Sequence, residues 1–259
     1  MSSQKDPLVQ LRAVHKSYPV GSEQVQVLKG ISFDVEAGEF LAIVGASGNG
    51  KSTLLNMITG IDHPTEGQVV VAGNVVTALS EDQLARWRGR NVGIVFQFFQ
   101  LLPALSLLQN VILPMDFVKT LRPKQRRARA YALLDRVGLS EHALKLPSMV
   151  SGGQQQRAAI ARALANDPPL VVADEPTGNL DTRTSGDVFD LFTDLAEHGK
   201  TVVIVTHDED MACRIPRTLE IADGLIIRDE NCTEPGVNST SPAAAGQRPD
   251  TYDACGGIR

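Results

Sequence analysis

Gly45-Ala46-Ser47-Gly48-Asn49-Gly50-Lys51-Ser52-Thr53 fits the pattern GxxxxGK[ST]. The apolar run Phe40–Val44 precedes this loop and a run of helical character, residues 54–58, follows it, which is the context that the pattern requires. Glycines let the backbone curl so that its N–H groups and the helix N-terminus face the phosphates of a nucleotide. Lys51 adds a positive charge, and the Ser52 hydroxyl can ligate Mg²⁺. We therefore expect every residue of the loop to bind the nucleotide.

Two further apolar runs, residues 170–173 and Thr201–Val205, resemble Phe40–Val44 in being nearly continuous. Such runs are typical of strands buried on both faces of a parallel sheet. Each run ends at residues able to do chemistry: the glycine loop, the pair Asp174 and Glu175, and His207. The sequence therefore predicts an α/β core whose sheet carries all three groups at its carboxyl edge, where open α/β folds bind ligands.

The rest of the chain divides into three kinds of sequence. Residues 8–35 alternate apolar and polar residues around Gly21 and Gly30, which predicts short antiparallel strands joined by turns, and residues 67–76 are expected to join them. Residues 97–165 are mostly helical in character, so we expect an inserted α-helical subdomain at about 98–165.

The C-terminal part lacks periodic apolar residues and is rich in Gly, Pro, Ser, Thr and Ala. Such a composition cannot recover its ordering entropy by burial. We expect one domain over residues 1–229 and a flexible tail over residues 230–259.

A second anion cradle is predicted at Val150-Ser151-Gly152-Gly153-Gln154, because a helical run follows and places Ser151 and the glycines at a helix N-terminus. One nucleotide does not need two cradles from one chain. A sandwich resolves this, in which each ATP lies between the glycine loop of one subunit and the serine-glycine cradle of another.

Asp174 ends an apolar strand, where its carboxylate can hold Mg²⁺ directly or through water, and Glu175 is then placed to polarise the attacking water. With the two cradles, this pair resembles the ATP-binding-cassette family, whose signature reads LSGGQ; here Val150 replaces the leucine. The resemblance covers residues 8–229. It implies a P-loop NTPase core of the RecA-like kind with an antiparallel β subdomain and an inserted helical subdomain.

The resemblance also assigns roles that the residues alone do not. His207 resembles the switch histidine that contacts the γ-phosphate and orients the water with Glu175. Gln97 resembles the glutamine that reaches Mg²⁺ and the water, while the segment beside it touches a membrane partner. Asp181 resembles a residue of the loop that crosses the dimer interface, and Tyr18 resembles the aromatic that stacks on adenine.

The stretches Glu175-Pro176-Thr177-Gly178-Asn179-Leu180-Asp181 and Phe96-Gln97-Phe98-Phe99-Gln100-Leu101-Leu102-Pro103 look most like the branch that serves lipoprotein release, macrolide export, antimicrobial-peptide resistance and cell division. This branch implies two copies docked beneath integral membrane permease subunits. Two alternatives remain: a cell-division ATPase that regulates a cell-wall hydrolase through a membrane partner, and a soluble cassette without transport.

Composition limits the partners and the compartment that we expect for this protein. A net charge of -5 excludes broad, nonspecific attraction to nucleic acid, so no nucleic-acid partner is expected. The 3 cysteines form no CxxC pair, which fits a reducing compartment better than a disulfide framework. No apolar run approaches the ~18 residues that a membrane span needs. We expect a cytoplasmic protein held on the inner face of the membrane by its permease.

Overall fold

The computed structural model describes residues 7–231 and folds them around two β-sheets. Within these residues the larger sheet has six strands in the order β10-β9-β3-β8-β7-β6. Its strands are β3 (Phe40–Val44), β6 (Val92–Val95), β7 (Leu170–Asp174), β8 (Thr201–Val205), β9 (Arg217–Ala222) and β10 (Leu225–Asn231). Neighbouring strands run parallel except β10, which pairs antiparallel with β9. The predicted parallel sheet through β3, β7 and β8 is therefore confirmed.

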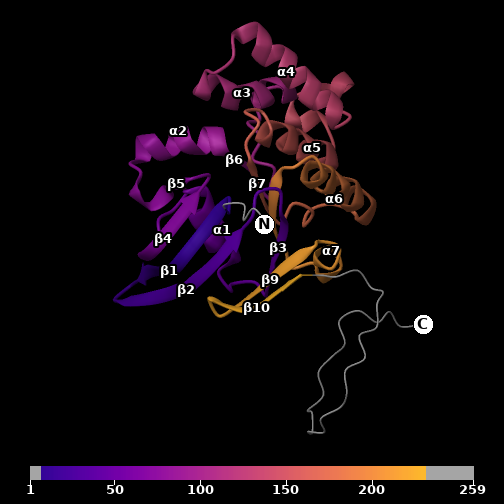
Figure 1. Cartoon of the computed structure of the whole chain (residues 1–259). Coiled ribbons are helices and arrows are strands. Elements are labelled where there is room, and N and C mark those ends of the chain that lie inside the picture. Colours follow the sequence, from indigo (N-terminus) through magenta and orange to yellow (C-terminus); the bar gives the residue numbers. More distant parts are fainter. Residues whose placement is uncertain (1–6, 232–259) are drawn as a thin grey trace, which may run out of the picture.

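Helices cover both faces of this sheet (Figure 1). Along β3 the side chains alternate between two cores: Leu41 and Ile43 pack with α1 and the smaller sheet, and Phe40 and Ala42 pack on the opposite side with α6 and α7. Burial on both faces explains why the central strands have no polar side of their own. The helices that flank the sheet are α1 (Lys51–Thr59), α2 (Glu81–Asn91), α6 (Thr182–Glu197) and α7 (Glu209–Ala212).

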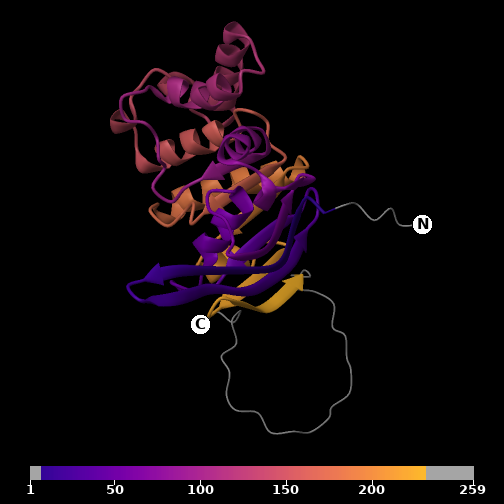
Figure 2. The ribbon, with the colours of Figure 1, turned by 90° about the vertical axis from the view of Figure 1, so that its left-hand side faces the viewer.

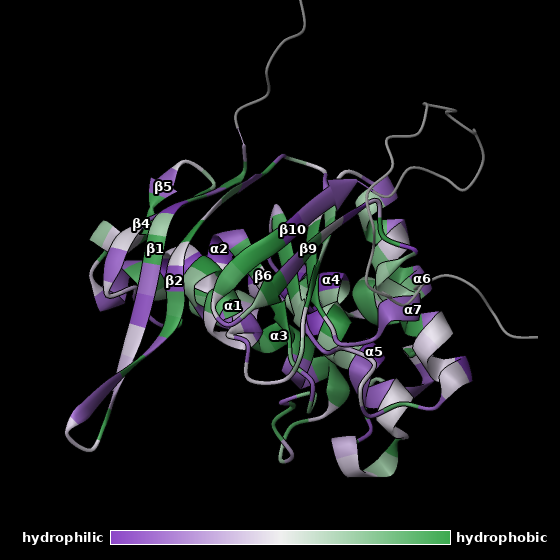
Figure 3. Cartoon of the chain, turned by 90° about the horizontal axis from the view of Figure 1, so that it is seen from below, coloured by the Kyte–Doolittle hydropathy of each residue, from purple (hydrophilic) through white to green (hydrophobic). Residues whose placement is uncertain are grey.

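The smaller sheet is antiparallel, in the order β2-β1-β4-β5, as the sequence predicts. Its strands are β1 (Val9–Val20), β2 (Glu23–Val35), β4 (Glu66–Val71) and β5 (Asn74–Val75), and the single-turn helix η1 (Val76–Ala78) follows. Figures 2 and 3 show the β1–β2 hairpin extending well beyond the helices.

The prediction of short strands with a turn at Gly30 is wrong. Strands β1 and β2 run for 12 and 13 residues, and only Gly21 lies at the turn between them. Gly30 lies inside β2 with a φ of 83°. Val14 of β1 pairs with Ile31 and the next residue, His15, pairs with Lys29, so the pairing skips Gly30. Gly30 is thus the extra residue of a β-bulge. A glycine in the sequence marks a bulge as well as a turn, which is why the prediction failed here.

The helical subdomain lies between β6 and β7 in the chain and forms the upper part of the molecule in Figure 1. Its elements are α3 (Leu107–Val118), α4 (Pro123–Arg136), η2 (Ser140–His142), η3 (Pro147–Met149) and α5 (Gly152–Ala163). It has an apolar core of its own, drawn from α3, α4 and α5. The predicted α/β fold with an antiparallel β subdomain and an inserted helical subdomain is confirmed.

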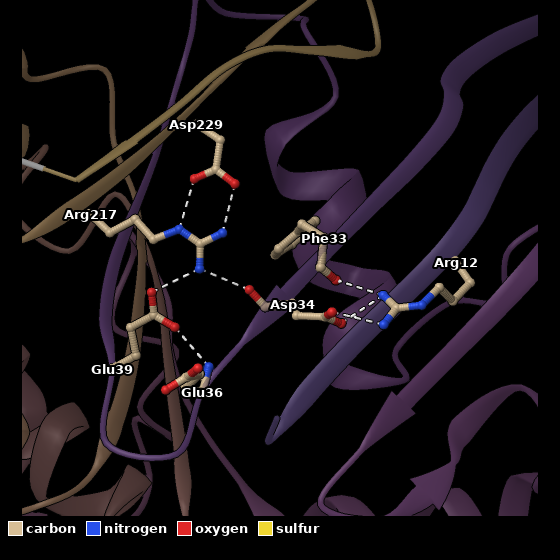
Figure 4. A network of polar contacts seen from close by, with 7 residues as sticks. All are labelled: Arg12, Phe33, Asp34, Glu36, Glu39, Arg217 and Asp229. Carbon is tan, nitrogen blue, oxygen red and sulfur yellow. Dashed lines mark hydrogen bonds and ion pairs between the residues drawn. The ribbon is translucent and has the colours of Figure 1, made fainter. Parts of the chain in front are cut away.

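Arg217 joins the two sheets (Figure 4). Its guanidinium donates two hydrogen bonds of 2.7 Å to Asp229 on β10, one of 2.8 Å to Glu39 before β3, and one of 2.8 Å to the backbone oxygen of Asp34 in β2. The Arg217 side chain is 17% exposed, so these charge-assisted bonds lie largely out of water. This contact fixes the end of β2 against β9 and β10.

The domain boundary at residue 229 falls inside β10, which runs on to Asn231. The remainder of the predicted flexible tail, residues 232–259, lies outside the described residues. Across residues 7–231, no helix has the length and apolar character needed to span a membrane.

Candidate functional site

The glycine loop lies between the end of β3 and the start of α1, as predicted. Gly48 and Gly50 have left-handed backbones with φ of 86° and 94°. A Cβ on Gly45 would lie 2.2 Å from the backbone oxygen of Ile221 in β9, so only glycine fits there. The Asn49 side-chain amide also donates to the Ile221 oxygen, at 3.0 Å. The loop is therefore braced against the core sheet.

Lys51 lies under this loop and is 6% exposed. Its ammonium donates to the backbone oxygens of Gly45 at 2.7 Å and Ala46 at 3.0 Å, so its charge lies within the curl of the loop. The first turn of α1 contains no acidic residue. A buried cation, a helix N-terminus and the loop N–H groups together favour an anion at this place.

Asp174 ends β7 directly beside the loop. Its carboxylate accepts a hydrogen bond of 3.2 Å from the Ser52 hydroxyl. Burial raises the pKa of Asp174, and the neighbouring Glu175 charge adds to this, while the Ser52 hydrogen bond and Lys51 act in the opposite direction. Burying a carboxylate in this way is unfavourable unless a cation or a donor compensates it.

A hydroxyl and a carboxylate are oxygen ligands of the kind that Mg²⁺ takes. No group of three or more His, Cys, Asp or Glu residues suited to a metal occurs among residues 7–231. This donor set fits Mg²⁺, which is usually bound by one or two protein oxygens together with substrate phosphates and waters.

Glu175 follows Asp174 and lies between Gln97 and His207. The Gln97 amide donates to one carboxylate oxygen of Glu175 at 3.2 Å, and Nδ1 of His207 lies 2.9 Å from the other. The Glu175 N–H donates to the backbone oxygen of Val205 at 2.8 Å, and its backbone is left-handed with a φ of 44°. A non-glycine residue in this conformation is strained by about 1–3 kcal/mol. The surrounding contacts therefore hold the carboxylate in one position.

The second cradle begins α5. Ser151 is the N-cap, its hydroxyl accepts from the Gln154 N–H at 3.3 Å, and its own N–H donates to the Gln154 side chain at 3.0 Å. Ser151 is exposed and Gly153 is buried. A Cβ on Gly153 would lie 2.2 Å from the Thr184 methyl carbon, so the helix start packs tightly against α6.

Asp181 is the N-cap of α6, where it accepts from the Thr184 N–H at 3.1 Å and the Thr184 hydroxyl at 2.7 Å. These two bonds hold the pKa of Asp181 below its ordinary value. Thr184 thus contacts both the second cradle and the segment predicted to cross a dimer interface.

Tyr18 lies in β1, in the smaller sheet. Its phenol donates to Asp62 at 2.8 Å, and Lys16 lies over its ring, 4.7 Å from the centroid.

The predicted residues form three groups in the structure. The glycine loop, Asp174, Glu175, Gln97 and His207 converge at the carboxyl edge of the large sheet. Residues 151–154 and Asp181 form the second group, in and beside the helical subdomain. Tyr18, the third, lies on the smaller sheet, where the side chain of the loop residue Thr53 acts on its phenol.

A cavity of about 890 Å³ lies between α2, α3 and β6, beside the segment after Gln97. Its lining includes Arg86, Arg90 and Phe117, and the Phe117 side chain is 77% exposed. Arg162 of α5 also lines it and donates to the backbone oxygen of Phe99 at 2.7 Å. The cavity is therefore connected to both the Gln97 segment and the helix of the second cradle.

A family model described as ABC transporter matches residues 28–178, more than half of the chain. The uncharacterized ABC transporter ATP-binding protein YvrO of Bacillus subtilis (strain 168) is 47% identical over 86% of this chain and 97% of that protein. The chain belongs to the ABC transporter family. Along the chain its glycine loop comes first, the SGGQ cradle second and the Asp-Glu pair third.

Two other ABC relatives are longer than this chain. The pyoverdine export ATP-binding/permease protein PvdT of Pseudomonas savastanoi pv. phaseolicola (strain 1448A / Race 6) is 46% identical over 92% of this chain. The macrolide export ATP-binding/permease protein MacB of Burkholderia pseudomallei (strain 1710b) is 45% identical over 93%. The chain spans only 36% and 37% of the lengths of these two proteins.

Among solved ABC structures, the ATP-binding cassette MJ0796 was determined as a dimer in a post-hydrolysis state bound to ADP and Pi. It matches this chain with a TM-score of 0.82 at 42% identity, over 87% of this chain and 99% of that chain. The P-loop NTPase fold is thereby confirmed, and the chain is an ATP-binding and ATP-hydrolysing ABC cassette.

Four residues with structural links to the site were missed from the sequence: Lys16, Asp62, Arg162 and Thr184. Lys16 precedes Tyr18 by two positions on one strand, a spacing that places both side chains on the same face and is a usable signal. Asp62 acts through partners distant in the sequence, and nothing local marks it. Thr184 bonds Asp181 three positions away, but its contact with Gly153 comes from a distant part of the chain.

Proposed function

We propose that two copies of this chain sandwich two molecules of Mg-ATP and drive a separate membrane permease of the lipoprotein-release or macrolide-export type. In each site, residues 45–53 and Tyr18 of one copy would hold the nucleotide. Residues 151–154 and Asp181 of the other copy would close over it. The support for this division is that the two cradles belong to different parts of the chain, the core and the helical subdomain (Figure 1).

Catalysis in this proposal depends on the position of Glu175. Gln97 and His207 each occupy one of its carboxylate oxygens, and each oxygen retains lone pairs to accept a proton from water. Glu175 would orient the water for in-line attack on the γ-phosphorus. Lys51 and the two helix N-termini would stabilise the charge spread over the phosphoryl oxygens.

Ser52 and Asp174 would hold Mg²⁺, and the Gln97 side chain would reach it. The bound ion would neutralise part of the phosphate charge. The buried Asp174 carboxylate supports this part of the proposal, because a cation beside it would offset the burial that raises its pKa.

The cavity beside α2 and α3 is our candidate for the permease contact. It exposes Phe117 among arginine side chains, so it suits a partner segment with apolar and acidic residues. Arg162 would connect that contact to the active site, because it binds the segment after Gln97 from the helix that begins at Ser151. The permease would hold the cassette on the inner face of the cell membrane.

Export is favoured over cell-wall regulation because PvdT and MacB are both named as export ATP-binding/permease proteins. Affinity isolation of the tagged chain from membranes tests the membrane partner that both alternatives require: an integral membrane permease should be recovered with it. Recovery of the chain with no such protein would count against the proposal.

The observation that carries the enzymatic proposal is the clamping of Glu175 by Gln97 and His207. Its test is Glu175→Gln, which keeps the shape of the side chain and removes the base. Mg-ATP should still bind, and phosphate release should fall by a factor on the order of 10²–10³. Full turnover in this variant would exclude the role of Glu175.

A further inference from the structure

Asp62 is a carboxylate shared between two side chains of β1. It accepts from the Lys16 ammonium at 2.7 Å and from the Tyr18 phenol at 2.8 Å. The His63 N–H donates to Asp62 at 2.7 Å, and Lys16 also donates to the His63 backbone oxygen at 2.7 Å. The Lys16 and Asp62 side chains are 12% and 32% exposed. This Lys16–Asp62–Tyr18 cluster is therefore a connected and partly buried network.

The cluster joins the smaller sheet to the helix that starts at the glycine loop. Gly60 reverses the chain after α1 with a φ of 64°, and the Ile61 and Asp62 N–H groups donate back to the Asn56 oxygen at 3.0 and 3.3 Å. Asp62 thus lies alongside α1 rather than beyond its end. The Thr53 side chain, in the first turn of α1, also lies near the Tyr18 phenol, where it acts to lower the pKa of that group.

Ionisation strengthens this arrangement. Burial by itself would raise the pKa of Asp62, but the bonds from Lys16, Tyr18 and the His63 N–H outweigh it and hold that pKa below its ordinary value. Burial, followed by the bond to Asp62, raises the pKa of Tyr18, so the phenol keeps its proton. A protonated phenol donating to a carboxylate is a charge-assisted hydrogen bond, about twice as strong as a neutral one.

The ring of Tyr18 consequently has one orientation, with one face covered by Lys16. Its phenol is fixed at Asp62, and the Lys16 ammonium covers one side of the ring at 4.7 Å from the centroid. A planar base would therefore stack on the face opposite Lys16.

We propose that Asp62 and Lys16 are positioning residues that orient Tyr18 for stacking on the adenine base. The cluster would fix the base-binding ring relative to the phosphate cradle, because the same contact joins β1 to α1. This inference rests on the proposed nucleotide site. It adds a claim about the base end of the nucleotide: Asp62 and Lys16 act there and not on the phosphates.

The experiment compares a ligand with a base and a ligand without one. Isothermal titration calorimetry would measure the affinities of Mg-ADP and Mg-pyrophosphate for wild type, Asp62→Ala and Tyr18→Phe. The matched control is Asp167→Ala. Asp167 accepts from Lys200 at 2.9 Å, and Lys200 also donates to the Pro168 oxygen at 2.9 Å, so the control pair copies the Lys16–Asp62 geometry elsewhere.

Asp62→Ala and Tyr18→Phe should each weaken Mg-ADP binding by about 3- to 10-fold, because each removes the charged hydrogen bond that orients the ring. Mg-pyrophosphate should bind within about twofold of wild type in both variants, and Asp167→Ala should bind both ligands as wild type does. Tyr18→Phe keeps the ring and leaves Asp62 paired with Lys16, so this variant tests the inference even if Asp62→Ala does not fold.

Unchanged Mg-ADP affinity in either folded variant would overturn the inference, and so would equal losses for Mg-ADP and Mg-pyrophosphate. If the wild-type chain bound Mg-ADP no more tightly than Mg-pyrophosphate, the proposed nucleotide site itself would be contradicted. The two failures are therefore distinguishable.

Discussion

The N-termini of α1 and α5 are both anion cradles, yet they are built differently. The cradle at α1 is braced from outside itself: Gly45 and Asn49 pack and bond against the Ile221 backbone of β9, and Lys51 lies buried under the loop. The cradle at α5 is closed mostly by its own residues, because Ser151 and Gln154 exchange hydrogen bonds and Ser151 stays exposed.

The difference indicates which half of the site a single chain can complete. The α1 cradle has a cation, a rigid loop and neighbouring carboxylates, so it can bind phosphate alone. The α5 cradle has a capped helix N-terminus with an exposed Ser151 and no lysine in its first turn. Such a surface suits contact with the outer side of a ligand that is already bound. The predictions below alter one cradle and compare it with the other.

The largest effect on nucleotide binding and phosphate release is expected when Lys51→Ala is compared with Ser151→Ala. Lys51→Ala should weaken Mg-ADP binding by the single chain and lower phosphate release by about 10²–10³-fold, because it removes charge from the phosphate cradle. Ser151→Ala should lower phosphate release by about 10-fold or more while leaving Mg-ADP affinity near wild type, because that cradle serves the other subunit. Calorimetry and steady-state phosphate release measure the two quantities.

Ser106→Ala is the control for the loss of a cap. Ser106 begins α3 with the same reciprocal pair of bonds, to Gln109, and it lies in no proposed site. Its phosphate release should remain near wild type. Equal losses of Mg-ADP affinity in Lys51→Ala and Ser151→Ala would remove the distinction between the cradles.

The packing of the α5 cradle gives the next effect. Gly153→Ala should lower the free energy of unfolding by about 1–3 kcal/mol, because its Cβ would overlap the Thr184 methyl carbon at 2.2 Å. Thr184→Ser removes that methyl and keeps the hydroxyl that bonds Asp181, so it should recover part of the loss in the double variant. Urea denaturation measures both. Simple additivity of the two substitutions would contradict this contact.

Arg217 braces the strand behind the α1 cradle, since Ile221 lies on the same strand. Arg217→Met should cost about 2 kcal/mol of unfolding free energy, because it leaves Glu39 and Asp229 without their shared cation. Arg228→Met is the control: its side chain is 59% exposed, and its loss should cost no more than about 0.5 kcal/mol. Equal costs in the two variants would argue against the brace.

The smallest effect concerns an exposed pair between the helical subdomain and α6. The Arg136 hydrogen bond holds the pKa of Asp194 below its ordinary value, and both side chains are 43% exposed. A carboxylate with a lowered folded pKa adds stability above its unfolded pKa, and this is lost as pH falls through the folded pKa. Arg136→Met should therefore cost no more than about 0.5 kcal/mol at pH 7 and less in acid. A cost that grows on acidification would contradict this.

Much of the site could be predicted because its signals are local. Each central strand reads as an apolar run that ends at or just before the segment holding its functional residue. Lys51, Asp174, Glu175 and His207 therefore follow from sequence order and the rule that parallel strands share one edge. The helix that starts at Ser151 was equally visible, because the glycines and the helical run adjoin it.

What the sequence could not supply depends on distant contacts. The bulge at Gly30 and the left-handed backbone of Glu175 are set by the strands beside them, and a glycine or glutamate alone does not reveal such a setting. Asp62 lies 44 positions from Tyr18, and Arg217 lies 178 positions from Glu39. No local pattern pairs these residues, because the fold brings them together.

The most direct test of the two-cradle site is the mass of Glu175→Gln by analytical ultracentrifugation, with and without saturating Mg-ATP. The chain should become a dimer with Mg-ATP, and adding Ser151→Ala should return it to a monomer because the second cradle then lacks its hydroxyl. A Glu175→Gln chain that stays monomeric with Mg-ATP, alone and with its permease partner, would contradict the shared site.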